Sequence, residues 1–341
     1  MLHSTSGACC LYLITGGGGF IGSHVTDALV ARGDNVTILD DFSTGRRANI
    51  EHLSARAGVR VIDGCTTDAT LVDEAMAECR YCLHLASAVG VELIVARALE
   101  TMRRNVMGAD VVISAAARHG TRLLFASSSE VYGKNSNGAL HEAADSVLGS
   151  PLTRRWSYAI AKSYGESLAH CYHRERGARN TIVRLFNTIG PRQSGAYGMV
   201  VPRLVRQALA GEDLTVYGDG TQSRCFLHVK DAAAGILTVC DHEGATGRAW
   251  NIGGSASITI RALAQRIIAR TASRSAIVLV PYDDAYEDGF EELGQRTPDT
   301  TAVRDLTGWT SRRSLDEALD DVIAFQRAEL AQKVPVAAYR A

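Results

Sequence analysis

The stretch of residues 11–23, which reads LYLITGGGGFIGS, constrains the fold of this 341-residue chain more than any other feature. It begins with an apolar run of the kind that forms a fully buried parallel strand. Thr15 and a run of glycines follow, and apolar residues between positions 20 and 30 then recur at helical spacing until Gly33 ends the predicted helix. A strand, a glycine-rich turn and a helix are the opening of a dinucleotide-binding βαβ unit.

Three glycines of this turn have different expected roles. Gly16 permits the tight turn, Gly19 lets a pyrophosphate approach the backbone, and Gly22 allows close packing of the helix. The helix start at Phe20 and Ile21 then offers unpaired N–H groups and the positive end of the helix dipole to the phosphates. These five residues are therefore expected to bind the cofactor.

An acidic residue indicates which dinucleotide is bound. The second predicted strand, residues 35–39, ends at Asp40, which lies about 20 residues beyond Gly22, where a ribose-binding carboxylate is expected. Such a carboxylate accepts hydrogen bonds from the ribose hydroxyls and repels a 2′-phosphate, so the sequence predicts NAD rather than NADP. The nearby Arg46 and Arg47 instead favour NADP, because a positive charge attracts a 2′-phosphate.

The overall charge and the termini exclude several classes of partner. The formal net charge is −1, so no general electrostatic attraction to nucleic acid or to a membrane surface is expected. No apolar stretch approaches the roughly 20 residues of a membrane-spanning helix. The N-terminus, MLHSTSGACC, lacks the basic start and apolar segment of a secretion signal. We therefore expect a cytoplasmic protein with no nucleic-acid or membrane partner.

The eight cysteines are scattered along the chain. Cys79 and Cys82 form a CxxC pair, but no second pair lies at zinc spacing, and Cys82 falls in an apolar predicted strand. Buried reduced thiols are expected, with no metal site.

Strand-like and helix-like segments alternate through the first half of the chain. Strands are predicted at 11–14, 35–39, 59–62, 81–85, 122–127 and 181–186, with helices at 71–79, 99–119 and 157–177 among the connections. This alternation predicts an α/β fold with a Rossmann-type, doubly wound parallel sheet. After Gly190 the segments become shorter, with helices at 202–210, 231–240, 260–271 and 315–328 and a strand at 214–217. We expect an NAD-binding domain at 1–190, a smaller C-terminal substrate-binding α/β cap at 191–330, and a tail at 331–341.

Three residues form a candidate catalytic group. Tyr158 and Lys162 are one helical turn apart and so project from one face of the predicted helix. A free phenol has a pKa of about 10, and a neighbouring ammonium favours its ionised form. Ser128 follows the fifth predicted strand, at the edge of the sheet where ligands bind. The serine hydroxyl can hold a substrate hydroxyl in line with Tyr158.

With these residues in view, the chain resembles the extended short-chain dehydrogenase/reductase family that modifies nucleotide sugars, and within it the UDP-glucuronate decarboxylases. The motifs that carry the resemblance are TGGGGFIGSH, Asp40, HLAS (84–87), Asn105, SSSEVYG (127–133), YAIAK (158–162), RLFNTIGPR (184–192), YGDGTQSRCFLHVKD (217–231), NIGG (251–254) and QRTPD (295–299).

This resemblance implies a tightly held NAD, a nucleoside-diphosphate sugar in the cap, Tyr158 as the base, and a homodimer formed through the helices at 100–119 and 157–175. It places these further residues at the cofactor: Ser43, Gly45, Leu85, Ala86, Ser87, Asn105, Tyr158 and Lys162. It places these at the substrate: Asn187, Val201, Tyr217, Arg224 and Arg296. The family often has an acid at the adenine where this chain has Cys65, and Asp63 or Thr66 could take its place.

The resemblance also bears on the reaction. Members oxidise C4 of the sugar to a ketone, and the 4,6-dehydratases then use an Asp–Glu pair where this chain has Ser129 and Glu130. Without the aspartic acid, dehydration is disfavoured. Ser129, Glu130 and Arg296 together are similar to the decarboxylases that convert UDP-glucuronate to UDP-xylose. The alternatives are 4-epimerisation of a UDP-hexose or UDP-uronate, and a dinucleotide-binding sensor without turnover.

Overall fold

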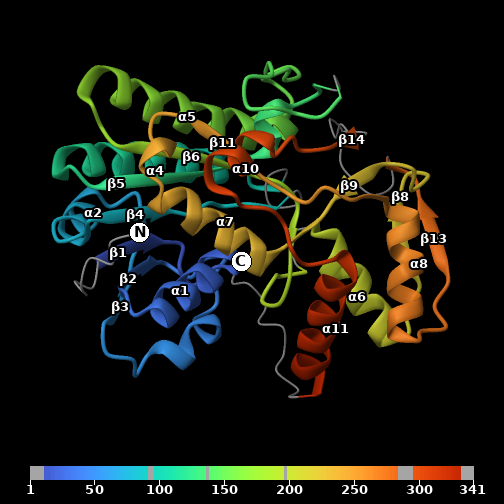
Figure 1. The fold of residues 1–341 in the computed structure, drawn as a ribbon. Helices are drawn as coiled ribbons and strands as arrows, with labels where there is room; N and C mark the ends of the chain where they lie inside the picture. Colours follow the sequence, from blue (N-terminus) through green and yellow to red (C-terminus); the bar gives the residue numbers. More distant parts are fainter. Residues whose placement is uncertain (1–10, 91–95, 136–137, 196–197, 283–294, 332–341) are drawn as a thin grey trace.

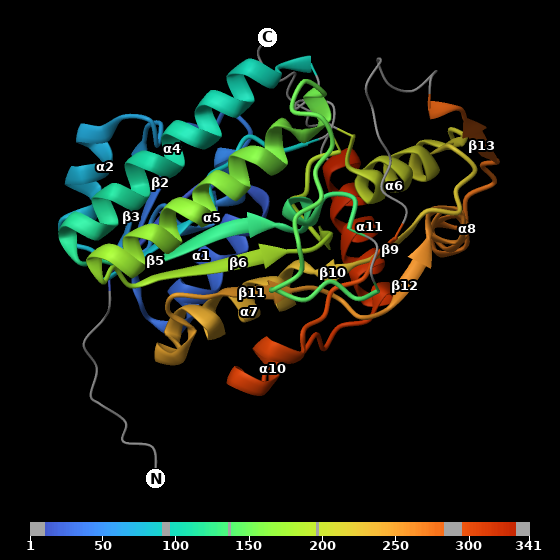
Figure 2. The same ribbon diagram turned by 90° about the horizontal axis from the view of Figure 1, so that it is seen from above.

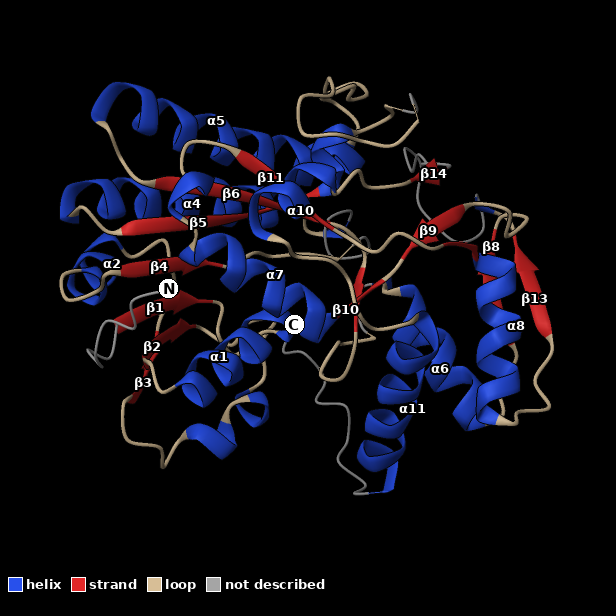
Figure 3. Cartoon of the chain, in the orientation of Figure 1, coloured by secondary structure: helices blue, strands red, loops and turns tan. Residues whose placement is uncertain are grey.

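The structure is a computed structural model that describes residues 11–90, 96–135, 138–195, 198–282 and 295–331. Its larger part is a seven-stranded parallel sheet in the order β11-β6-β5-β4-β1-β2-β3 (Figure 3). The strands are β1 (Leu11–Thr15), β2 (Asn35–Asp40), β3 (Val59–Asp63), β4 (Tyr81–His84), β5 (Arg122–Ser128), β6 (Asn180–Leu185) and β11 (Ala249–Ile252). The Rossmann-type fold is therefore confirmed.

Helices cover both faces of this sheet. They are α1 (Phe20–Arg32), α2 (Ala69–Met76), α4 (Ala98–His119), α5 (Ser157–Arg176) and α7 (Val229–Asp241). Successive strand residues point to opposite faces, so Ile14 packs with α1 and α7 while Leu13 packs with α2, α4 and α5. Figure 2 shows α4 and α5 side by side over the second face. Cys79 and Cys82 are buried in the core of that face as free thiols.

A smaller lobe lies beside the sheet (Figure 1). Its helices are α6 (Val200–Ala210), α8 (Ile260–Thr271) and α11 (Leu315–Ala331), which share one apolar core. Its strands are β7 (Thr188–Ile189), β8 (Leu214–Tyr217), β9 (Ser223–Cys225), β10 (Leu227–His228), β12 (Ser257–Thr259), β13 (Ile277–Val280) and β14 (Gln295–Arg296), and α10 (Thr301–Thr307) packs near β11. They form three small sheets, β12-β9-β14, β13-β8 and β10-β7.

The chain returns to the large sheet after residue 190. β11 pairs with β6, and α7 packs on α1, so both elements belong with the sheet rather than with the small lobe. The four residues of β11, Ala-Trp-Asn-Ile, contain no apolar run long enough to mark a strand in the sequence. The division of the chain at residue 190 stays a prediction.

Helix ends follow the sequence closely. α1 ends where predicted, because Gly33 adopts the left-handed conformation (φ 90°) and its N–H caps the carbonyls of Leu29 and Val30. Within the described ranges, no helix has the length and apolar character needed to cross a membrane.

Candidate active site

The glycine turn between β1 and α1 forms a cradle that only glycine allows. Gly16 has a positive φ of 77°, and a Cβ atom on it would lie 2.6 Å from the backbone nitrogen of Ala86. A Cβ atom on Gly22 would lie 2.1 Å from the carbonyl oxygen of Gly16. The turn therefore packs closely against the loop after β4, and Gly16, Gly19 and Gly22 line a cavity at the start of α1, where a dinucleotide pyrophosphate would bind.

Gly22→Ala is expected to weaken NAD binding by about 10- to 100-fold, because relieving a clash with backbone costs about 1–3 kcal/mol. Isothermal titration of the purified chain with NAD measures this. Gly33→Ala is the control. Gly33 also has a positive φ, of 90°, but no atom lies within 4 Å of the position that a Cβ atom on it would take. Equal NAD affinity in wild type and Gly22→Ala would contradict the cradle.

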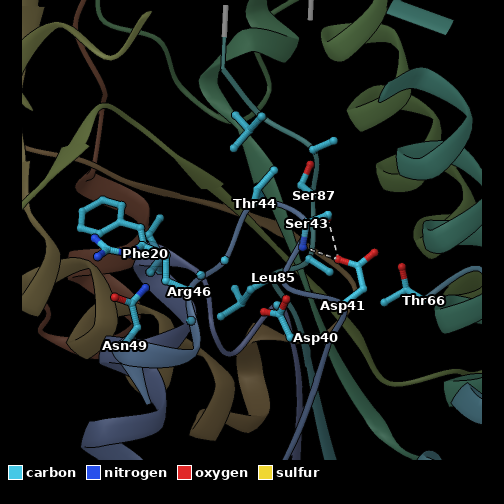
Figure 4. A pocket seen from close by; sticks show the side chains of 18 of the residues that line it. Phe20, Asp40, Asp41, Ser43, Thr44, Arg46, Asn49, Thr66, Leu85 and Ser87 are labelled. Atoms are coloured by element: carbon cyan, nitrogen blue, oxygen red, sulfur yellow. Dashed lines mark hydrogen bonds between the residues drawn. The ribbon is translucent and has the colours of Figure 1, made fainter. Parts of the chain in front are cut away.

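A cavity opens from this turn along the ends of β2, β3 and β4 (Figure 4). Most of the residues predicted for the cofactor line it, whereas Tyr158 and Lys162 line the adjoining cavity. Those that line the first are Gly16, Gly19, Phe20, Ile21, Gly22, Asp40, Ser43, Gly45, Leu85, Ala86, Ser87 and Asn105. Sequence reasoning missed Asp41, Thr44, Asn49 and Arg104, which also line it. Asn49 had no motif to mark it, and its side chain donates a 2.9 Å hydrogen bond to the carbonyl of Gly18 in the turn.

Asp40 is at the end of β2, and both its carboxylate oxygens already accept a backbone hydrogen bond. The N–H groups of Gly18 and Phe42 each donate at 2.8 Å. Burial raises the pKa of Asp40, and the two backbone hydrogen bonds offset this shift only in part. Each oxygen keeps a further lone pair, so contact with a ribose hydroxyl stays a prediction.

The two arginines that weighed toward NADP are paired with carboxylates. Arg46 lines the cavity but pairs with Glu329 of α11, and Arg47 pairs with Asp63. Asp63 is therefore engaged outside the cavity.

Cys65 and Thr66 line the cavity at the position where the family often has an acid. An acid is nevertheless close by, because Asp41 pairs with Arg104 there and the Arg104 guanidinium lies 3.8 Å from the Cys65 sulfur. Figure 4 shows the hydrogen bonds from Ser43 to the Asp41 carboxylate, with Thr66 beside them.

Asn105 of α4 holds the loop that follows β4. Its amide oxygen accepts hydrogen bonds from the Ser87 hydroxyl at 3.1 Å and the Ala88 N–H at 2.9 Å, and its amide nitrogen donates to the Ala88 carbonyl at 3.0 Å. Asn105 thus fixes a loop that forms a wall between two cavities.

A second cavity adjoins the first and contains the three predicted catalytic residues, Ser128, Tyr158 and Lys162. The two cavities share a wall made by Phe20, Ile21, Leu85, Ser87, Val89, Gln193 and Met199. β5 delivers Ser128 at its last residue, and α5 delivers Tyr158 and Lys162 one turn apart. Gly165 lets α5 pack close, since a Cβ there would lie 2.3 Å from the Phe125 ring of β5.

The environment of Tyr158 sets its acidity. Burial raises the pKa of this phenol, and hydrogen bonds with the hydroxyls of Ser87 and Ser128 lower it in part. Lys162 lies behind it, with its ammonium 5.7 Å from the centre of the tyrosine ring and donating a 2.8 Å hydrogen bond to the Ala126 carbonyl. Burial lowers the pKa of Lys162 to about 8. The net pKa of Tyr158 stays above its ordinary value, and a positive charge brought closer to the phenol oxygen would favour the phenolate that a base at neutral pH needs.

Glu130 lies between two arginines in the same cavity. Its carboxylate oxygens contact Arg155 and Arg296, each at 2.6 Å, and the side chains of both arginines are 7% exposed or less. Burial raises the pKa of Glu130, but the charges of Arg296 and then Arg155 outweigh this, so the net pKa is lowered and the carboxylate is held ionised. Ser129 is buried beside it, 3.5 Å from the Arg296 guanidinium. Sequence reasoning missed Arg155, which belongs to no spaced motif.

The remaining substrate predictions have different outcomes. Asn187, Tyr217, Arg224 and Arg296 line the second cavity, and Arg224 of β9 is in register with Arg296 of β14. Val201 does not line it: it is 1% exposed in the core of the small lobe, and its neighbour Val200 faces the cavity.

Arg203 was also missed, although it lines this cavity. Its guanidinium lies 4.4 Å from the centre of the Tyr217 ring and donates to the Thr215 carbonyl at 2.9 Å. Among the described residues that line the second cavity, Glu130 is the sole acid, against the cations Arg155, Lys162, Arg203, Arg224 and Arg296.

Comparisons with known proteins agree with this geometry. The sequence profile of the NAD dependent epimerase/dehydratase family matches residues 12–253. UDP-N-acetyl-alpha-D-glucosaminuronate decarboxylase of Bacillus cytotoxicus is 38% identical over 92% of this chain and 97% of that protein. UDP-glucuronic acid decarboxylase 1 of Danio rerio is 34% identical over 93% of this chain and 73% of that protein.

Among solved structures, the UDP-glucuronic acid 4-epimerase of Bacillus cereus, in complex with UDP-glucuronic acid and NAD, superposes with a TM-score of 0.85. It is 25% identical, and the match covers 93% of this chain and 99% of that one. The family resemblance read from the motifs is thus confirmed over nearly the whole chain. This chain belongs to the NAD-dependent epimerase/dehydratase family, with NAD as its cofactor.

Proposed function

We propose that this chain is an NAD-dependent decarboxylase that converts UDP-glucuronate to UDP-xylose through a 4-keto intermediate. The observation that carries the proposal is Glu130 held between Arg155 and Arg296 in the cavity of Tyr158. The names of the decarboxylase relatives support it independently.

The charge of the second cavity suits a substrate with several negative charges. Its walls carry four arginines and Lys162 against the single carboxylate of Glu130, counting the described residues. A nucleoside diphosphate brings two negative charges and a uronate carboxylate a third. Guanidinium groups pair with phosphate and carboxylate oxygens in a fixed, often bidentate geometry. We infer that Arg224 contacts the diphosphate, and that Arg296 contacts the carboxylate.

The ionised state of Glu130 argues against dehydration. A 4,6-dehydratase must protonate the departing 6-hydroxyl, and an acid can do this only if it carries a proton at working pH. Because the two arginines lower the pKa of Glu130, this carboxyl holds no proton at neutral pH. Its partner in the sequence is Ser129 rather than an acid.

The residues of the cavity provide for each proton of the decarboxylation. Tyr158, as phenolate, takes the proton of the sugar 4-hydroxyl, and Lys162 and Ser128 hold the phenol and the hydroxyl in place. Bound NAD would accept the C4 hydride and later return it. The product of oxidation is a β-keto acid, whose C5–C6 bond breaks with its electrons passing into the C4 ketone, so carbon dioxide leaves and an enolate remains.

The enolate must then be protonated at C5 before the hydride returns to C4. A water that Ser129 and Glu130 position gives this proton, the hydroxide left is neutralised by a proton from solvent, and Arg296 stabilises the enolate charge. Tyr158 finally gives its proton back to the C4 oxygen. The net reaction consumes one proton and releases one carbon dioxide, with the cofactor unchanged.

Two alternatives follow from particular comparisons. The relative that is 38% identical carries the name of a UDP-N-acetylglucosaminuronate decarboxylase, which supports the same reaction on a sugar with an acetamido group at C2. The likeness to a UDP-glucuronic acid 4-epimerase supports inversion at C4 without loss of carbon dioxide.

Incubating the purified chain with UDP-glucuronate or UDP-N-acetylglucosaminuronate, with and without added NAD, separates these functions. Mass spectrometry and NMR of the products are expected to show loss of carbon dioxide and a UDP-pentose from UDP-glucuronate. Faster decarboxylation of the acetamido sugar would move the proposal to that substrate. An unchanged mass with an inverted C4 signal would identify an epimerase. Absence of turnover on any nucleotide sugar would favour the sensor.

We also propose that the chain acts in the cytoplasm as a homodimer formed through α4 and α5. These helices pack side by side and present large apolar side chains to solvent, with Met107 44% exposed and Tyr164 39% exposed. Light scattering is expected to give twice the chain mass. Met107→Glu should then give a monomer that still folds, whereas a monomeric wild type would contradict the dimer.

A further inference from the structure

The last three residues of β5 are each tied to α5. The Ala126 carbonyl accepts a 2.8 Å hydrogen bond from Lys162, and the Ser128 hydroxyl lies beside the Tyr158 phenol, whose pKa it lowers in part. Between them, the Ser127 hydroxyl donates a 2.5 Å hydrogen bond to Glu166. Tyr158, Lys162 and Glu166 are spaced four residues apart, so they lie on one face of the helix over successive turns. Glu166 is therefore the third member of a row that contains the base and its lysine.

Arg184 fixes Glu166 from the neighbouring strand. Arg184 lies on β6, opposite Ser127 of β5. Its guanidinium contacts the Glu166 carboxylate through Nη2 at 2.6 Å and through Nε at 2.9 Å. Glu166 is 9% exposed, so its carboxylate is largely shielded from water. The hydrogen bonds from Arg184 and Ser127 offset the cost of burying this charge.

Arg184 is itself held in place. It donates to the Glu142 carbonyl at 2.9 Å and stacks 4.8 Å from the Tyr132 ring. The Tyr132 hydroxyl in turn donates a 2.7 Å bond to Asn251 of β11. The contact of Glu166 is thus part of a buried network that spans β5, β6, β11 and α5.

We propose that Glu166 is a positioning residue for catalysis, which holds α5 in register with the end of β5 and places a negative charge one turn beyond Lys162. Glu166 lines neither cavity, so it acts through Ser127 and Lys162 rather than on the substrate. The inference rests on the proposed role of Tyr158 as base, because the register it fixes is the one that aligns Ser128 with the Tyr158 phenol.

The electrostatic part of this role concerns the ammonium of Lys162. Burial lowers the pKa of Lys162, and the Glu166 carboxylate opposes that shift. The other groups that face Lys162 are Tyr158 on the same helix and His84 of β4. Burial and then Lys162 lower the pKa of His84 to about 3, so this imidazole is neutral in the working range and does not replace Glu166. Arg184 lies on the far side of Glu166 and would lower the pKa of Lys162 further if that carboxylate were absent.

Glu166→Gln in the full chain with NAD is the direct test. We expect kcat to fall by about 10- to 100-fold while KM for the UDP-sugar stays within about 2-fold, because misplacement of the base affects the reacting geometry rather than binding. The alkaline limb of the kcat profile is expected to move down by about 1 pH unit, because the ammonium loses a nearby opposite charge. Glu175→Gln, an exposed glutamate on the same helix, is the matched control.

A readout that needs no substrate accompanies the kinetics. The pH dependence of Lys162 acetylation in the NAD-free chain, followed by mass spectrometry, reports the pKa of this lysine. It is expected to shift down in Glu166→Gln, while the exposed Lys230 shows no shift. This result would support the role of Glu166 even if UDP-glucuronate proved to be the wrong sugar.

Ser127→Ala separates the two parts of the role and serves if Glu166→Gln fails to fold. It removes the bond that fixes the register but leaves the charge, so kcat should fall with the alkaline limb unchanged. A lower Tm in Glu166→Gln with an unchanged pH profile and an unchanged Lys162 pKa would show a structural role alone and overturn the proposal. Wild-type kcat in Ser127→Ala would overturn the register argument.

Discussion

Replacing Tyr158 with phenylalanine is expected to lower kcat by about 10²- to 10⁴-fold, which is the usual contribution of a positioned general base. Among the described residues that line the second cavity, the phenol lies beside the strand-end serine and has a buried ammonium behind it. Without the phenol hydroxyl, Ser128 and Ser87 remain, but an aliphatic hydroxyl ionises far less readily than a phenol. The chemical step therefore loses its proton acceptor.

The ring of Tyr158 stays in place in this variant, so folding and cofactor binding should be kept. Tm and the NAD dissociation constant are expected to stay close to the wild-type values. Tyr172→Phe is the matched control, because Tyr172 lies on the same helix, lines neither cavity and shares a 3.0 Å hydrogen bond with Ser114 of α4. Full activity in Tyr158→Phe would remove Tyr158 as the base.

The features that the sequence predicted correctly are local ones. The turn of residues 16–22, the end of α1 at Gly33, and the strands that deliver Asp40 and Ser128 all depend on neighbours within a few positions. Glycine conformation, strand hydrophobicity and helical spacing act at that range. Part of the first cavity could be predicted for the same reason, since the loops that directly follow β1, β2 and β4 contribute to its walls, whereas Arg104, Arg192 and Met199 reach it from distant segments.

The features that were missed depend on contacts between distant residues. Arg155 acquires its role only because Glu130 lies opposite it, and Arg104 only because Asp41 does. β11 is a strand because β6 offers it an edge, not because of its own four residues. Val201 shows a finer limit: two adjacent valines begin α6, and only the packed helix determines that Val200 faces the cavity and Val201 the core.

Replacing Glu130 with glutamine is expected to destabilise the fold and to abolish most of the activity together. The carboxylate compensates two arginines whose side chains are 5% and 7% exposed. Removing one partner of a buried ion pair costs about 3–5 kcal/mol, because the remaining charge is left without compensation. The same change removes the group that aligns Arg296 with the substrate, so kcat should fall by about 10²-fold or more.

The pH dependence of unfolding tests whether the lost charge of Glu130 causes the loss of stability. The folded-state pKa of Glu130 is lowered, so the stability it contributes is present above its unfolded pKa of about 4.3 and is lost as pH falls toward the folded value. The difference in the free energy of unfolding between wild type and Glu130→Gln should therefore be full at pH 7 and shrink at pH values below about 4. Denaturant titrations at several pH values measure it.

The double variant Glu130→Gln/Arg155→Leu distinguishes the charge from the chemistry. It removes one of the two buried cations that Glu130 pairs with, so part of the lost stability should return, because a buried apolar side chain carries no desolvation cost. Activity should not return, since neither the carboxylate nor its pairing with Arg296 is restored. Recovery of kcat together with stability would mean that Glu130 serves only to hold the fold, and the carboxylate would then have no place in the reaction.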